Sequence, residues 1–151
     1  MKMDTILCAT DGSDHARTAL DIAADLAHAH HARVLVLHVQ GSHGSGRIPE
    51  ALEILEKLEH IRLTEADILR AAAEQIAKQG VMALKDRGVA QVEALVVEGD
   101  PARQIIETAR ERGVDVIVLG SRGLGDLQGL LLGSVSHKVA HLAPCTCIIA
   151  K

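Results

Sequence analysis

The glycine-rich segment 120–136 holds the residues whose types and spacing best suit the binding of an anion. Gly120 and Gly123 are separated by two residues, nine more follow, and Gly133 then precedes Ser134. Glycine has no side chain, so the backbone can approach an oxyanion closely. If a helix begins at Ser134, its N–H groups and the positive end of its dipole favour a phosphate. The segment therefore predicts a phosphate-binding loop.

Polar side chains of the same segment could complete such a site. Ser134 and Ser136 offer hydroxyl donors, and Arg122 offers a planar guanidinium that suits phosphate geometry. An alternative interpretation is a plain glycine-rich turn in which Ser134 only caps the following helix. The residues alone leave both interpretations open.

A second glycine-rich segment, 41–49, has the glycine spacing of a P-loop. That motif needs a lysine for the β- and γ-phosphates and then Ser or Thr for Mg²⁺, whereas this chain has Arg47 and Ile48. A dinucleotide fingerprint fails as well, because Gln128 stands where its third glycine belongs. We interpret segment 41–49 as a solvent loop.

Asp11, the histidines and the cysteines have structural interpretations. Asp11 precedes Gly12 in a common turn pair, so its carboxylate could simply accept hydrogen bonds from nearby amides. Cys145 and Cys147 would share one face of a strand, where small thiols are usual core residues. The nine histidines lack acidic or Cys partners at metal-ligating spacing, so we favour solvated side chains over a metal site.

Alternating strands and helices must position these candidates. Strand-like apolar runs cover 5–10, 33–40, 91–98, 114–119 and 145–150, and helical patterns cover 16–31, 51–87, 101–112 and 134–142. The pattern over 51–87 has candidate breaks near Thr64 and Gly80, whereas Asp100 and Pro101 suit an N-cap and a first helical position. Such alternation indicates a largely parallel sheet between helical layers, with ligands outside the carboxyl ends of the strands.

Composition limits the function classes. The 151 residues, of which 48% are apolar and 24% charged, predict one globular domain spanning 1–151. A net charge of -4 and the absence of Phe, Tyr and Trp argue against a nucleic-acid partner. Residues 1–5 do not resemble a secretory signal, and no apolar stretch suits a membrane span. We therefore expect a cytoplasmic protein with no membrane partner.

The whole chain resembles the universal stress proteins, in particular their ATP-binding type. Those members carry Gly, two residues, Gly, nine residues and then Gly-Ser or Gly-Thr, a pattern that Gly120, Gly123, Gly133 and Ser134 match without a gap. Segments 6–13, 37–39, 99–102 and 143–145 also resemble stretches of the family. Ala9 departs from it, because the family often has Pro at that position.

The resemblance implies an α/β fold: a five-stranded parallel sheet of order 3-2-1-4-5 with helices on both faces, Rossmann-like and similar to the adenine nucleotide alpha hydrolases. It also implies a nucleotide site in which Asp11 meets the ribose or adenine side, Val39 lines the adenine pocket and the start of the last helix surrounds the phosphates. The implied site residues are Ala9, Thr10, Asp11, Val39, Leu119, Gly120, Arg122, Gly123, Gly133, Ser134, Val135 and Ser136.

The function that the resemblance implies is a regulatory protein of the stress response that holds ATP, with Mg²⁺ or Mn²⁺ on the phosphates, and has no fast turnover. One alternative is an enzyme that slowly hydrolyses ATP or transfers phosphate to Ser134 or Ser136, and another is an interaction module that no longer binds nucleotide. In the resembled fold the strand 145–150 lies at a sheet edge, and in this chain it carries no charged residue. We therefore expect two chains to pair partly through this strand as a homodimer.

Overall fold

Strands and helices alternate along the chain in the order that the sequence pattern predicts. The computed structural model describes residues 1–41, 64–123 and 132–151. Its elements are β1 (Thr5–Ala9), α1 (Asp14–His30), β2 (Arg33–Gln40), α3 (Glu65–Asp86), β3 (Val92–Glu98), α4 (Pro101–Glu111), β4 (Val116–Gly120), α5 (Ser134–Leu142) and β5 (Thr146–Ala150).

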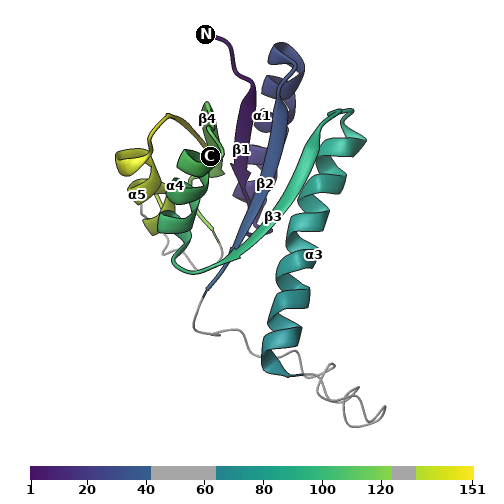
Figure 1. Cartoon of the computed structure of the whole chain (residues 1–151), viewed down its shortest axis with the longest axis vertical. Helices are drawn as coiled ribbons and strands as arrows, with labels where there is room; N and C mark the ends of the chain where they lie inside the picture. Colours follow the sequence, from purple (N-terminus) through teal and green to yellow (C-terminus); the bar gives the residue numbers. More distant parts are fainter. Residues whose placement is uncertain (42–63, 124–131) are drawn as a thin grey trace.

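The five strands form one parallel sheet of order β3-β2-β1-β4-β5, which confirms the expected topology. The helices α1 and α3 contact one face of the sheet, while α4 and α5 pack together on the other (Figure 1). The chain leaves β1 for β2 on one side and later returns to form β4 on the other side of β1. The carboxyl ends of β1 and β4 therefore meet at the point where the strand order reverses, the usual ligand position in such sheets.

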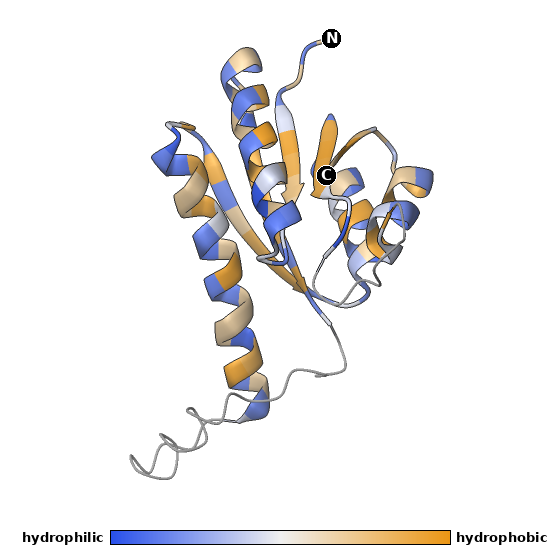
Figure 2. Ribbon diagram, turned by 180° about the vertical axis from the view of Figure 1, so that it is seen from behind, coloured by the Kyte–Doolittle hydropathy of each residue, from blue (hydrophilic) through white to orange (hydrophobic). Residues whose placement is uncertain are grey.

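Mainly aliphatic side chains fill the two layers between sheet and helices. The runs Val34–Leu37 and Val116–Val118 are fully buried, as expected for strands covered on both faces. The hydropathy colours of Figure 2 show that the strands are largely hydrophobic. Toward the sheet α1 presents mainly alanines, among them Ala19, Ala23 and Ala24. Because their side chains are short, α1 lies close to β1 and β4, and this contact positions the first turn of α1 beside the end of β4.

The long helical pattern is broken at one of its two candidate positions. Thr64 N-caps α3 and forms a capping box with Asp67, as a break near Thr64 requires. The expected break at Gly80 is wrong, because α3 continues through it. A Cβ on Gly80 would lie 2.8 Å from Val36 Cγ1, so this glycine serves the close approach of α3 to β2. Residues 42–63, which include most of the glycine-rich segment 41–49, lie outside the described residues.

Three strand starts differ from the sequence prediction. The strand β3 begins at Val92 and not at Gln91, and the other two differences concern β4 and β5. Val114 was expected in the fourth strand, but its N–H donates to the Ala109 carbonyl at 3.0 Å and so completes the end of α4. The ladder of β4 with β5 begins at Val116 opposite Thr146, which leaves Cys145 without a register partner and outside β5. The predicted start of α4 is confirmed: Asp100 accepts the Arg103 N–H at 3.0 Å, directly before Pro101.

Candidate functional site

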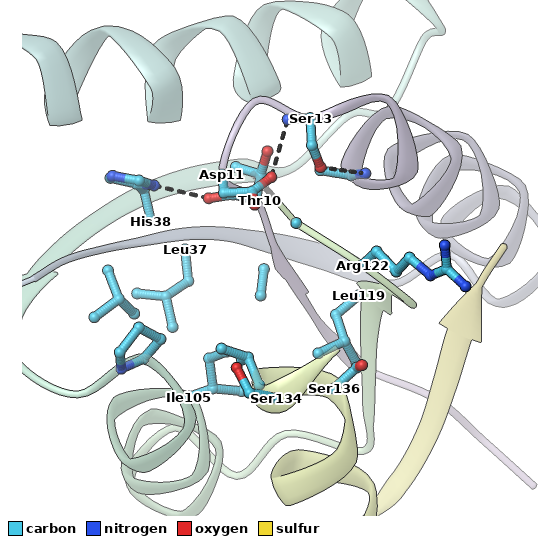
Figure 3. Close-up of a pocket in the computed structure, with 17 residues that line it drawn as sticks. Thr10, Asp11, Ser13, Leu37, His38, Ile105, Leu119, Arg122, Ser134 and Ser136 are labelled. Carbon is cyan, nitrogen blue, oxygen red and sulfur yellow. Dashed lines mark hydrogen bonds between the residues drawn. The ribbon is translucent and has the colours of Figure 1, made fainter. Parts of the chain in front are cut away.

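A pocket of about 260 Å³ opens at the carboxyl ends of β1, β2 and β4 (Figure 3). Four segments form it: the turn after β1, the end of β2, the start of α4, and the loop after β4 together with the start of α5. The lining residues are Ala9, Thr10, Asp11, Ser13, Ala16, Leu37, His38, Val39, Pro101, Ile105, Leu119, Gly120, Arg122, Gly123, Ser134, Val135 and Ser136.

The turn after β1 is held by its own side chains. Ser13 N–H donates to Asp11 Oδ1 at 2.9 Å, and Gly12 N–H donates to Thr10 Oγ1 at 3.2 Å. Gly12 has φ +82°, a backbone angle that favours glycine. His38 Nδ1 lies 2.8 Å from the Thr10 carbonyl, and because a carbonyl only accepts, this nitrogen carries the proton. Asp11 thus has the turn-forming role that its sequence context suggested, while its side chain still lines the pocket.

An apolar slot lies between the end of β2 and the start of α4. Val39 and Leu37 come from β2, Leu119 from β4, and Pro101 with Ile105 from the first turns of α4. Sequence reasoning missed Pro101 and Ile105 as site residues. The signal was available, because residues four apart in a helix share one face, so Ile105 must follow Pro101 toward the sheet.

The loop after β4 packs against the first turn of α1. A Cβ on Gly120 would lie 2.7 Å from His15 Cβ and 2.9 Å from the His15 carbonyl carbon, so packing against α1 already requires glycine there. Ser121 is buried, and its Oγ lies 3.0 Å from His15 Nδ1. Arg122 lines the pocket, but in Figure 3 its guanidinium points away from Ser134. Ser121 was not predicted as a residue of this region, although its contact with His15 joins the loop to α1.

The start of α5 differs in detail from the expected one. Gly133, and not Ser134, is the N-cap, and no side chain caps this helix. Gly133 has φ -70°, so a side chain there would meet no forbidden backbone angle. The first intrahelical bond runs from His137 N–H to the Gly133 carbonyl at 3.0 Å. The N–H groups of Ser134, Val135 and Ser136 precede it, at the helix position that suits an anion.

Metal and redox chemistry find little support in the described residues. In 1–41, 64–123 and 132–151, no three His, Cys, Asp or Glu side chains form a group that could hold a metal ion. Burial raises the pKa of the Cys8 thiol to about 12 and also raises the pKa values of Cys145 and Cys147. Thiols with raised pKa values stay protonated and react slowly. Over the same ranges, no helix has the length and apolar character needed to cross a membrane.

Comparison with known proteins shows which family this chain resembles over its length. The model of the "Universal stress protein family" matches residues 2–151. The chain belongs to the universal stress protein family. Universal stress protein YxiE of Bacillus subtilis is 36% identical over 153 residues, covering 97% of each chain. The structure of universal stress protein UspA from Lactobacillus plantarum has the same fold, with a TM-score of 0.79, 24% identity and coverage of 100% and 99% of the two chains.

Some solved structures that resemble this universal stress protein contain a ligand. A universal stress protein in complex with cAMP is 25% identical, with a TM-score of 0.69 and coverage of 99% of this chain and 98% of that one. In the present universal stress protein, every residue expected to bind nucleotide lines the pocket except Gly133, which N-caps α5. The fold thus brings together side chains from both halves of the sequence.

Proposed function

We propose that this universal stress protein binds ATP in the pocket and acts through its occupancy, without fast turnover. The observation that carries the proposal is the convergence of an apolar slot and a helix N-terminus in one pocket. A planar base suits the slot, and phosphates suit the N–H groups at the start of α5. The relative in complex with cAMP supports an adenine nucleotide as the class of ligand.

In the proposed arrangement the adenine lies between Val39 and the first turns of α4, and the ribose lies near Asp11. The phosphates then reach Gly123 and the N–H groups of Ser134–Ser136. A helix N-terminus stabilises negative charge without any lysine, which fits a site with no P-loop.

Slow or absent turnover follows from the side chains around the pocket. Among the described lining residues, Asp11 supplies the one carboxylate, and its Oδ1 already accepts the Ser13 N–H. The described lining holds no second carboxylate, and its one imidazole, His38, comes from β2 and not from the start of α5, where the phosphates are proposed to lie. Mg²⁺ or Mn²⁺ would be held mainly by phosphate oxygens, because the described residues offer no cluster of metal ligands.

We also propose that two chains pair through β5. This strand is an edge of the sheet, and its residues Thr146–Ala150 include no charged side chain to protect the edge. Pairing with a second copy would satisfy the outward backbone groups and close the assembly with two-fold symmetry.

A pair of matched glycine variants tests the site. Gly123→Val adds a branched side chain to the pocket lining beside the proposed phosphates, so it should lower ATP affinity by at least about tenfold, or about 1.4 kcal/mol. Gly41→Val is the control, since a Cβ there meets nothing within 4 Å and lies outside the pocket. Titration calorimetry measures both, and circular dichroism verifies that each variant is folded. Equal ATP affinity in the two variants would remove the assignment of the phosphate position.

A further inference from the structure

The two serines at the start of α5 differ in their surroundings. Ser134 is exposed at the pocket, whereas Ser136 is only 2% exposed. Ser136 Oγ lies 2.8 Å from the Ser121 carbonyl oxygen and 3.1 Å from the Gly133 carbonyl oxygen. Carbonyl oxygens only accept, and a hydroxyl has one hydrogen, so the single proton of Ser136 is already donated within the protein. A phosphate oxygen would need that same proton.

The carbonyl that accepts this proton belongs to a fixed peptide group. Ser121 N–H donates to the Ala150 carbonyl at 2.6 Å, which extends the ladder between β4 and β5 by one bond. The Ser121 carbonyl also accepts Gly133 N–H at 2.6 Å. The Ser121 carbonyl therefore accepts hydrogen bonds from Gly133, the N-cap of α5, and from Ser136, the third residue of that helix. Because Ser121 also bonds to Ala150, these contacts connect the start of α5 to the end of the sheet.

We propose that Ser136 is a positioning residue that clamps the first turn of α5 to the Ser121 carbonyl, and that Ser134 supplies the hydroxyl for the phosphate. This assignment rests on the proposed nucleotide function. It gives the two serines different roles although both line the pocket.

The clamp matters because hydrogen bonds to phosphate depend steeply on distance and angle. The backbone N–H groups of Ser134, Val135 and Ser136 can all be aimed at one anion only while the first helical turn stays in place. The bonds from Gly133 and Ser136 to one carbonyl provide that constraint before any ligand arrives, so little ordering is needed on binding.

Amide hydrogen exchange tests the clamp without any nucleotide. In Ser136→Ala the turn should open more often, so the Gly133 amide should exchange about fivefold faster, as expected for one lost hydrogen bond. Ser136→Thr retains a hydroxyl and should restore slow exchange. Ser134→Ala is the matched control, because the same change two residues earlier leaves the clamp intact and should leave Gly133 exchange unchanged.

ATP titration of the same variants separates the two roles. Ser136→Ala should weaken ATP binding about fivefold together with faster Gly133 exchange, and Ser134→Ala should weaken it by a similar factor with normal exchange. If the Gly133 amide exchanges at the same rate in Ser136→Ala as in the unaltered protein, the clamp is wrong. If that variant then still binds ATP more weakly, Ser136 is a direct ligand of the phosphate. If the unaltered protein binds no ATP, the proposed function fails, while the exchange comparison still accepts or rejects the clamp.

Discussion

At the level of single residues, hydrogen bonding determines which polar groups of the pocket serve the fold. Ser13 caps α1, Ser121 contacts His15, and Ser136 bonds to backbone carbonyls. Residue type and spacing identified Ser134 and Ser136 as a pair of hydroxyl donors. The distinction between them depends on the position of the Ser121 carbonyl, which comes from the fold and not from the local sequence.

The glycines of the motif show the same limit of sequence reasoning. Gly120 was expected to leave room for a ligand, and the structure shows that it leaves room for the first turn of α1. Gly133 was expected among the residues around the phosphates, and the structure shows that it N-caps α5 and does not line the pocket. The motif correctly indicates a close approach at Gly120, but the partner there is His15 of α1, which is distant in the chain and which no local pattern identifies.

The cysteines lead to a prediction about reactivity. Burial raises the pKa of Cys8 to about 12 and raises the pKa values of Cys145 and Cys147, so all three thiols are protonated at neutral pH. Iodoacetamide should therefore alkylate the folded protein slowly at neutral pH, faster as the pH rises, and rapidly in denaturant. Mass spectrometry of the labelled protein measures this. Rapid labelling of Cys145 or Cys147 in the folded chain at neutral pH would indicate a reactive thiol and contradict the expectation.

At the level of elements, local sequence patterns predicted most strands and helices, because their buried residues recur with the period of the element. The run 33–40 matches β2 (Arg33–Gln40), Asp100 is the N-cap that was predicted, and the candidate break near Thr64 coincides with the start of α3. The prediction failed at Gly80, because glycine also has low helix propensity and so resembles a break. Its place inside α3 is explained by Val36 on a different strand, a contact that no local pattern contains.

The edge strand β5 leads to a prediction about assembly. If two chains pair through β5, light scattering should give twice the 16.0 kDa mass of one chain. Thr146→Lys adds a charge beside the edge in each copy and should shift the equilibrium toward the single chain. Thr18→Lys, the same change at an exposed position of α1, should leave the mass unchanged. A 16.0 kDa particle for the unaltered protein at micromolar concentration would exclude this pairing.

At the level of the whole molecule, the site exists because the sheet order makes β1 and β4 neighbours. Periodicity predicted the strands and their parallel direction, but the order 3-2-1-4-5 came from the family resemblance. The reason is physical: the register of β1 with β4 joins residues that are far apart in the chain, such as Leu7 and Ile117, and other strands, such as β5, are also largely apolar. Local sequence therefore cannot choose between the possible neighbours.

Binding of an adenine nucleotide in this pocket can be tested directly because of the composition of the chain. Because the protein has no Trp, Tyr or Phe, it absorbs little in the near ultraviolet, where adenine absorbs strongly. Equilibrium dialysis against ATP can therefore be read from absorbance alone. If the pocket binds ATP, absorbance on the protein side should exceed that on the other side and saturate near one ATP per chain, and mass spectrometry should recover intact ATP. Equal absorbance on both sides at millimolar ATP would contradict it.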